Sequence, residues 1–550
     1  MLRWLLTPAH FVQLLGYLKK ERPRFWLARI LFLLSPLLAL RRSTPSLTFQ
    51  PPFYRIGRRP ISPGCLPMDV PVLTAALRDE LSRATATIKD GLAGRLRESP
   101  TTPLAYPEDD PAAVYDRLLL EATRKLAQCR DAGSAGEVLR LLRDEITPIF
   151  GPLSSHHVFS RLELLLGLRK MRVGIYDHVF HLVGGGQRYT AFMAERLKEK
   201  YDVTYIANQD ASLEQYREWF DIDLTGCKLR IVRIPALEGF GWSYIDEDMV
   251  LNKKRNPFDV ISEESLRYDV FINANMLTKV QPLSPVSVFV CHFPDHRKGR
   301  FFAADRYDYI VSSSRYGTGW IKEKWGLEAT HLIYPPVEME DPESDPADKE
   351  RTILSVSRFE PAGTKKQLEM AKAFIGLAES RPDIGRTWKL VLAGGSPMPN
   401  PYLEKIAGLA GKAGSRIELM PNLSHGEVRA LYKSASLFWH ACGLDQTDPG
   451  LVEHFGMTTV EAMQNYCVPI VIRGGGQLEI VQDGVSGFTF ATIAELQERT
   501  LTVIDDEPRR MDLARKAYLR SREFNGRAFT DRAAALFSEI EGALMAPDAL

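Results

Sequence analysis

Two glutamates with seven residues between them, Glu453 and Glu461, enclose a Phe-Gly turn in the segment 453–463. A helix that begins near Thr458 would direct its free N–H groups and its positive end toward a ligand. From the first helical turn, Glu461 could accept two hydrogen bonds from a ribose diol, while Glu453 could bind a sugar hydroxyl. The alternative is structural, because Thr458 and Glu461 have the spacing of a capping box. That alternative explains neither Glu453 nor the glycine-rich loop 474–477 after the next strand.

Cationic side chains follow a second strand-like segment. Arg358 comes directly after the apolar run 353–357, and Lys365 and Lys366 follow it within the next eight positions. Cations at the carboxyl end of a strand, close to the start of a helix, suit a diphosphate. A solvated basic loop is an equal alternative, and spacing alone does not decide which lysine would bind a ligand.

A third segment, 181–188, holds three consecutive glycines between a strand and a helix. Glycine lets the backbone approach a phosphate or a sugar closely, and the following helix N-terminus favours negative charge. The segment lacks the GxGxxG spacing, and no acid follows it at the distance that a nicotinamide ribose requires. Taken alone, these glycines fit a tight strand–helix turn about as well as a ligand-binding loop.

The elements that must position these residues begin at Met171, where apolar strand-like runs start to alternate with helical patterns. This alternation predicts a doubly wound α/β fold with two Rossmann-like domains facing a cleft. We expect an N-terminal Rossmann-like domain over 171–337 and, after an acidic linker at 338–350, a C-terminal Rossmann-like domain over 351–505. C-terminal helices are expected over 506–550.

The first 170 residues have a different character. Residues 1–60 carry eleven Lys or Arg and a single acid, Glu21, and they include the apolar run 25–40. A helix over that run would be roughly 24 Å long, short of a ~30 Å hydrocarbon core. We therefore interpret 1–68 as a membrane-associating segment and linker that lies on anionic lipid, with a helix packed on its own domain as the alternative. Residues 69–170 form a helical appendage without a chemical motif.

The whole chain has 550 residues, a net charge of +1, 45% hydrophobic and 25% charged residues. This composition excludes wholesale disorder, collagen and a polytopic membrane protein, and it gives no reason to expect nucleic acid. The six cysteines include no CxxC pair, which favours reduced thiols in a cytosolic protein over a disulfide framework or a zinc site. Two DxD sequences, 221–223 and 246–248, lie in loop-like segments and are interpreted as surface acids that bind no metal.

Taken in order, these motifs resemble those of the retaining glycosyltransferases of the GT-B fold, family 4, over about residues 171–545. One segment, 439–443, resembles a subgroup of long bacterial surface-polysaccharide transferases. Gln187 departs from the family's common glutamate, and 464–466 are bulkier than usual, which leaves acceptor contacts and local packing open. The resemblance rests on the segments 184–188, 291–293, 309–314, 333–337, 354–359, 365–366, 392–395, 453–461 and 474–481.

The resemblance implies a nucleotide-sugar donor, linked to UDP or GDP, bound without a metal or a cofactor. Glu461 would hold the ribose, and Arg358 with Lys366 (or Lys365 in its place) would hold the diphosphate. Glu453 and His292 would be the catalytic residues beside the transferred sugar, and His440 either approaches the donor or packs. The remaining donor contacts would come from Phe455, Gly456, Met457, Gly185 and Gly186.

The chemistry implied is sugar transfer with retention, in which the leaving phosphate oxygen takes the proton of the acceptor. We expect a hexose-type sugar to pass to a lipid-linked or polysaccharide acceptor, as in lipopolysaccharide synthesis, on the cytoplasmic face of the membrane. One alternative is a nucleotide-sugar epimerase on a similar fold, against which the paired glutamates and the cations argue. The other is a non-catalytic nucleotide-sugar-binding scaffold.

Overall fold

The computed structural model describes most of the chain from residue 163 onward and short stretches before it. The predicted membrane-associating segment 1–68 and most of the predicted appendage 69–170 lie outside the described residues. No helix within the described part of the chain is both long enough and apolar enough to cross a membrane. The described residues are 124–125, 128–129, 132–150, 163–164, 167–181, 183–235, 254–294, 298–338, 346–412 and 416–545.

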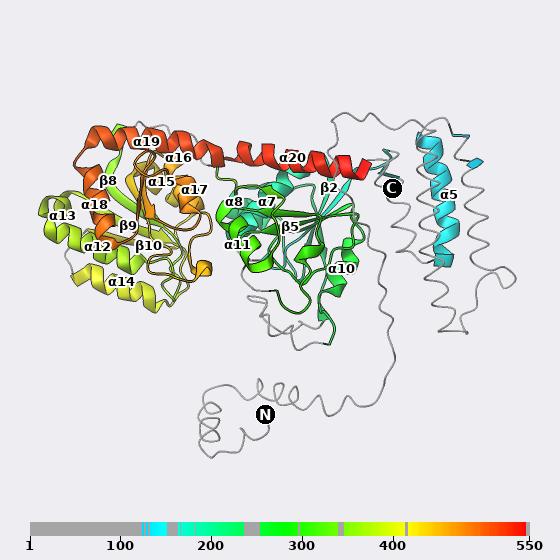
Figure 1. The fold of residues 1–550 in the computed structure, drawn as a ribbon, viewed down its shortest axis with the longest axis horizontal. Coiled ribbons are helices and arrows are strands. Elements are labelled where there is room, and N and C mark those ends of the chain that lie inside the picture. The colour runs from blue at the N-terminus through cyan, green and yellow to red at the C-terminus, as the bar shows by residue number, and fades with distance from the viewer. Residues whose placement is uncertain are drawn as a thin grey trace, which may run out of the picture. The chain divides into compact units, whose positions relative to one another are not determined.

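The first α/β half is built on a seven-stranded parallel sheet with the strand order β3-β2-β1-β4-β5-β6-β7. Figure 1 draws this half in cyan and green. Its central strands are buried on both faces, as in β5, where all six residues are buried, whereas the edge strands β3 and β7 are partly exposed. Such strands form because near-continuous apolar runs can be covered by helices on each side of a parallel sheet. The strands are β1 (Arg172–Tyr176), β2 (Asp202–Ala207), β3 (Lys228–Ile231), β4 (Val270–Asn273), β5 (Val286–Cys291), β6 (Tyr309–Ser312) and β7 (His331–Leu332).

Helices connect these strands and cover the sheet. α7 follows β1 directly and begins inside the predicted glycine segment. α11 begins after Ser314, whose side chain accepts a hydrogen bond from the N–H of Gly317 and so caps the helix. The helices of this half are α7 (Gly185–Leu197), α8 (Gln215–Phe220), α10 (Asp259–Ser265), η3 (Ala304–Arg306) and α11 (Arg315–Trp325), and α5 (Ala132–Phe150) precedes them in the chain.

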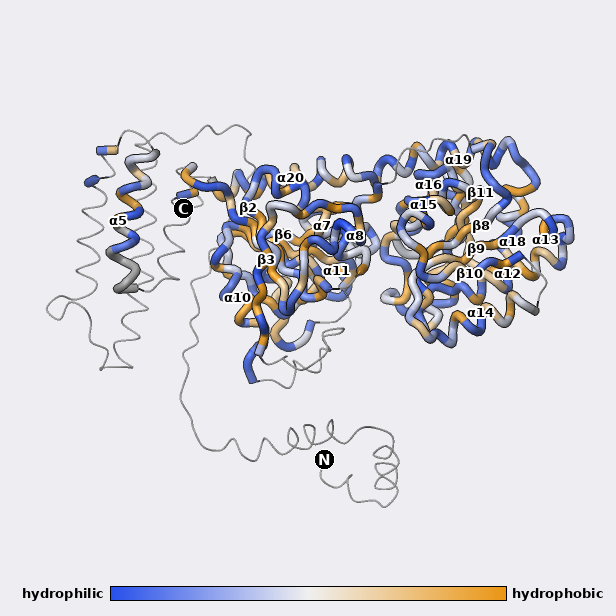
Figure 2. The backbone as a smooth tube through the Cα atoms, turned by 180° about the vertical axis from the view of Figure 1, so that it is seen from behind, coloured by the Kyte–Doolittle hydropathy of each residue, from blue (hydrophilic) through white to orange (hydrophobic). Residues whose placement is uncertain are grey.

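The second half repeats the pattern with six parallel strands in the order β10-β9-β8-β11-β12-β13. Figure 2 shows hydrophobic residues concentrated in the strands of both sheets. The strands are β8 (Glu350–Val356), β9 (Lys389–Gly394), β10 (Ile417–Pro421), β11 (Ala435–His440), β12 (Val468–Ile472) and β13 (Phe488–Phe490). The helices are η4 (Pro346–Asp348), α12 (Gln367–Ser380), α13 (Pro382–Thr387), α14 (Pro401–Lys412), α15 (His425–Ser434), η5 (Pro449–Leu451), α16 (Met457–Gln464), α17 (Gln477–Ile480) and α18 (Ile493–Ile504).

The last two α-helices described pack against different halves of the chain. α19 (Glu507–Ser521) contacts α16 and β12 of the second half. After η6 (Arg522–Phe524), α20 (Gly526–Met545) buries Phe529, Leu536 and Ile540 in the core of the first half. The predicted α/β fold with two sheets and C-terminal helices is therefore confirmed.

Strand order fixes where a ligand can bind. In both sheets the order reverses beside the first strand, between β1 and β4 in one and between β8 and β11 in the other. Side chains that follow the carboxyl ends of parallel strands meet at one edge, and ligands bind at such reversal points. The predicted residues Arg358 and His292 and the predicted glycine segment all follow the carboxyl ends of strands.

Candidate functional site

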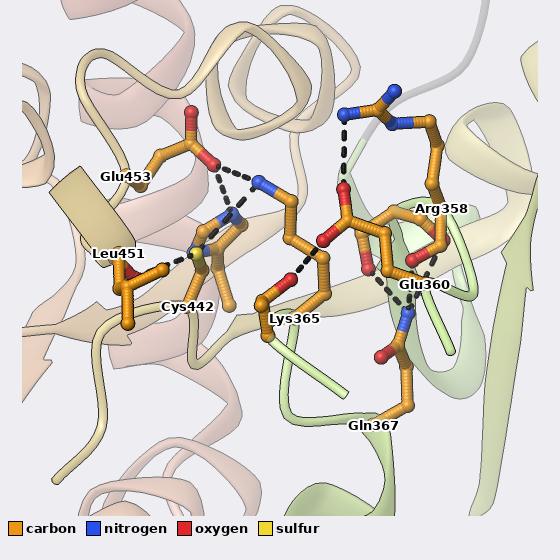
Figure 3. Close-up of polar contacts among 10 residues, drawn as sticks. Arg358, Glu360, Lys365, Gln367, Cys442, Leu451 and Glu453 are labelled. Carbon is orange, nitrogen blue, oxygen red and sulfur yellow. Dashed lines mark hydrogen bonds and ion pairs between the residues drawn. The ribbon is translucent and has the colours of Figure 1, made fainter. Parts of the chain in front are cut away.

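The centre of the candidate site is the carboxylate of Glu453, which is held by two basic side chains. Its Oε2 lies 2.9 Å from Nζ of Lys365 and 3.4 Å from Nε2 of His440. Figure 3 shows Lys365 directed at this carboxylate, with Cys442 beside it. The side chains of Glu453 and Lys365 are each only 21% exposed, and that of His440 is 3% exposed.

The contact between Glu453 and Lys365 stabilises the charged form of both side chains. Burial opposes ionisation of Glu453, but the charge of Lys365 and the contact with His440 outweigh it and hold its pKa well below the ordinary value. The charge of Glu453 in turn raises the pKa of Lys365 against the effect of burial. Glu453 is therefore an anion at neutral pH. Such a group accepts a hydrogen bond from a sugar hydroxyl and does not act as a proton donor.

The two adjacent lysines differ sharply in their surroundings. Lys365 binds Glu453, whereas Lys366 has φ 61° in the left-handed region and is the N-cap of α12. No hydrogen bond or ion pair of the Lys366 side chain is found among the described residues. The turn is fixed by Gln367, whose Nε2 donates to Ser357 Oγ (2.9 Å) and to the Arg358 carbonyl (2.9 Å). The structure thus brings Lys365 to the predicted catalytic carboxylate and does not bring Lys366 there.

Arg358 lies on the other side of Lys365 from Glu453 (Figure 3). Its side chain is 69% exposed, and its guanidinium pairs with Glu360 at 2.9 Å. Glu360 also accepts a hydrogen bond from the hydroxyl of Thr364. An anionic ligand can reach the exposed guanidinium, but it must compete with Glu360 for it.

Glu461 already has two partners. Its Oε1 lies 2.8 Å from Arg188 of the first half, and its Oε2 accepts from the hydroxyl of Tyr432 at 2.9 Å. The capping-box alternative for Thr458 and Glu461 is wrong, because α16 begins at Met457 and Gly456 is its N-cap without a side-chain bond. Glu461 is consequently the fifth residue of the helix, just past the first turn in which it was predicted.

The turn before α16 depends on close packing of glycines. Gly456 has φ 117°, and a Cβ there would lie 2.5 Å from Nε2 of Gln477. The N–H of Gly476 donates to the carbonyl of Glu453 at 2.9 Å, which joins the glycine-rich loop to the turn. Phe455 is buried against Tyr334 and Phe524, so only its backbone can face a ligand. The backbone N–H groups that are predicted to contact the donor therefore lie in a tightly packed turn at the start of a helix.

The glycine segment of the first half approaches this turn. A Cβ at Gly185 would lie 3.1 Å from Sδ of Met457, and one at Gly186 would lie 3.3 Å from Nε2 of His292. A side chain at either position would be in tight contact with these neighbours, so glycine favours the close approach. The His292 ring packs edge-on against Tyr189, with the centroids 5.1 Å apart. Removal from water, with a contribution from His454, lowers the pKa of His292 to about 4, so the ring is neutral at pH 7.

Three residues of this region were not among the predicted site residues. The sequence leaves the role of His440 open between a donor contact and packing, and its position at the end of β11 is the signal that points to the site. Arg188 belongs to the glycine motif, but nothing in the sequence connects it with Glu461. Glu479 accepts hydrogen bonds from the backbone N–H groups of Arg315 and Tyr316, both at 2.8 Å, and so caps α11 of the other half. These last two contacts join residues more than 160 positions apart.

The DxD sequence at 221–223 has structural partners. Asp221 ends α8 in the left-handed region, and Asp223 accepts hydrogen bonds from Thr225 and Lys198. The second DxD, at 246–248, lies outside the described residues. Within the part of the chain that the structure describes, no three His, Cys, Asp or Glu side chains are grouped so that they could hold a metal ion.

Part of the chain matches a known protein family. Residues 337–520 match the family model described as glycosyl transferases group 1. The alpha-1,3/1,6-mannosyltransferase ALG2 of Rhizomucor pusillus is 25% identical over 50% of this chain and 71% of its own length. The ALG2 of Saccharomyces cerevisiae is 23% identical over 44% of this chain and 56% of its own length.

Among solved structures, Anabaena Alr3699/HepE in complex with UDP-glucose is similar, with a TM-score of 0.50 and 15% identity. The alignment covers 67% of this chain and all of that one. At this identity the likeness concerns the fold, and it matches the arrangement of two parallel sheets described above.

Proposed function

We propose that the chain is a retaining glycosyltransferase that transfers a hexose-type sugar from a nucleotide-sugar to a lipid-linked or polysaccharide acceptor on the cytoplasmic face of the membrane. The match of residues 337–520 to the family model described as glycosyl transferases group 1 supports the class of enzyme. The observation that carries this proposal is the buried Glu453 anion, which is held by Lys365 and His440 beside the start of a helix.

The proposed mechanism follows from the charges in the site. Glu453 is held as an anion by Lys365 and is proposed to accept a hydrogen bond from the transferred sugar. The bond between the anomeric carbon and the phosphate oxygen breaks, the acceptor oxygen bonds to the same face of that carbon, and the acceptor proton passes to the leaving phosphate. Lys365 and the exposed Arg358 stabilise the negative charge that develops on the diphosphate.

Donor recognition is proposed for the turn before α16 and for Glu461. The free N–H groups at the start of that helix favour an anion, and Glu461 can accept hydrogen bonds from a ribose. A UDP- or GDP-linked sugar fits this arrangement. It is supported by the UDP-glucose bound to Alr3699/HepE and by the mannosyltransferase activity in the name of the ALG2 relatives.

The first experiment is a thermal-shift series with UDP, GDP and ADP, followed by turnover assays with UDP-glucose, UDP-N-acetylglucosamine and GDP-mannose. Nucleotide at 100 times its dissociation constant should add about 2.7 kcal/mol of stability. We expect Glu453→Gln to abolish sugar transfer to membrane lipid extracts, while Glu498→Gln, an exposed residue of α18, leaves it unchanged. Interconversion of the free nucleotide-sugar would indicate an epimerase, and no shift with any nucleotide would favour the scaffold.

Membrane attachment is proposed from residues 1–60, which the structure does not describe. Replacing the basic and apolar residues of this segment should release the chain from vesicles that contain anionic phospholipid. Vesicle binding that is unaffected by these changes would refute this part of the proposal.

A further inference from the structure

A second group of polar side chains lies at the carboxyl edge of the first sheet. Asp177 follows β1, Asn275 follows β4 and His292 follows β5, and the three strands are neighbours in the sheet. Asp177 is fully buried and Asn275 is 7% exposed. Polar groups removed from water in this way need partners, so each contact here has a structural or a ligand-binding reason.

Asp177 fixes the orientation of the Asn275 amide. Asn275 Nδ2 donates to Asp177 Oδ1 at 3.0 Å, and the backbone N–H of Val179 donates to the same oxygen at 2.9 Å. Because that oxygen accepts from Val179, it must also accept from Asn275, so the amide nitrogen faces Asp177. The Asn275 Oδ1 is therefore left on the opposite side of the amide, available as an acceptor.

Asn275 Oδ1 and His292 Nε2 both lie beside Gly186. A Cβ at Gly186 would lie 3.3 Å from Asn275 Oδ1 and 3.3 Å from His292 Nε2. His292 Nε2 is buried and has no hydrogen-bond partner within the described part of the chain. Because residue 186 is glycine, no side chain from this position contacts these two atoms. A carbonyl-type oxygen accepts a hydrogen bond, and a neutral imidazole N–H donates one. Together they complement a hydroxyl group, which does both.

We propose that Asn275 Oδ1 and His292 Nε2 bind one hydroxyl group of a saccharide substrate, and that Asp177 acts as the positioning residue that orients the Asn275 amide. The proposal rests on the proposed function, because it takes the saccharide to be a substrate of sugar transfer. The hydroxyl belongs either to the transferred sugar or to the acceptor, and the chemistry of recognition is the same for both.

The experiment compares the full-length wild type with Asn275→Ala in two reactions, donor hydrolysis without acceptor and sugar transfer. Loss of one hydrogen bond to an uncharged group should lower kcat/KM roughly 10-fold. A fall in both reactions assigns the hydroxyl to the transferred sugar, and a fall in transfer alone assigns it to the acceptor. Binding of UDP or GDP, which lack the saccharide, should be unchanged. If the wild type transfers no sugar, the proposed function fails. If the wild type is active, the ratio of kcat/KM between Asn275→Ala and the wild type tests the role of Asn275.

Two further variants separate binding from folding. Asp177→Ala removes the oxygen that accepts from Asn275 and Val179, so the Asn275 amide loses its fixed orientation and kcat/KM should fall although Asn275 and His292 are unchanged. Asp177→Asn keeps an amide oxygen that can accept both hydrogen bonds, and it should recover at least 5-fold over Asp177→Ala. Unchanged kcat/KM in Asn275→Ala, or no recovery of Asp177→Asn over Asp177→Ala, would overturn the proposal.

Discussion

The strongest prediction concerns the two adjacent lysines, which the structure separates clearly. Replacing Lys365 by Met removes the partner that lies 2.9 Å from Glu453 and leaves that carboxylate without its cation. Breaking a fully buried ion pair costs about 3–5 kcal/mol, because the remaining charge is uncompensated. Since both side chains are 21% exposed, we expect about 2–3 kcal/mol. For a domain of this size, that loss corresponds to a fall in Tm of roughly 5–10 °C.

The matched control is Lys366→Met. Lys and Met are equally strained at φ 61°, and the Lys366 side chain has no hydrogen bond or ion pair among the described residues. We therefore expect a change in Tm of less than about 2 °C for this variant. The loss of activity should also be larger for Lys365→Met than for Lys366→Met. Lys365→Met should lower kcat/KM about 100-fold because the diphosphate loses a cation, and Lys366→Met should lower it less than 5-fold.

A double-mutant cycle tests whether the stability loss of Lys365→Met comes from the uncompensated charge of Glu453. In Lys365→Met/Glu453→Gln neither charge remains, so most of the lost stability should return although the enzyme stays inactive. The measurements are thermal unfolding of all four proteins and donor turnover of each. Equal effects of the two lysine variants, or a double variant whose stability loss is the sum of the single losses, would refute the assignment of Lys365.

Three other predictions follow from single contacts. Glu479→Gln should lower the stability by about 1 kcal/mol in thermal unfolding, because a carboxylate that caps two N–H groups of α11 is replaced by an amide; an unchanged Tm would contradict this. Gly456→Ala should cost more than about 2 kcal/mol and abolish nucleotide binding in a thermal-shift assay, because φ is 117° and the methyl group would meet Gln477. The ring of His292 has a pKa of about 4 in the folded chain against 6.5 ordinarily, so the unfolded chain takes up the proton first as pH falls. His292→Gln should therefore lose about 2 kcal/mol less stability than wild type between pH 6.5 and 4, and equal losses in urea titrations would contradict this.

The sequence was sufficient for the class of fold because the signals for it are local. Apolar runs such as 286–291 and 468–472 predict buried parallel strands without reference to the rest of the chain. The glycines at 184–186 predict a close backbone approach for the same reason. Their place directly after a strand, together with Glu453 before a second glycine turn, predicts which segments meet at the candidate site.

Local sequence patterns did not predict contacts that depend on a single backbone angle or on the exact start of a helix. Spacing cannot show that Lys366 takes the left-handed conformation and that Lys365 consequently reaches Glu453. It also cannot show that α16 begins at Met457, which removes the capping box predicted as an alternative for Thr458.

Contacts between distant segments belong to the tertiary structure alone. The pairing of Arg188 with Glu461, the capping of α11 by Glu479 and the return of α20 to the core of the first half join residues far apart in the chain. The periodicity of a sequence reports which face of an element is apolar, and it carries no information about which distant element will cover that face. The sequence by itself thus determined the elements and the residue types at their carboxyl ends. Only the packing of two sheets and a shared helix decided which of those side chains meet.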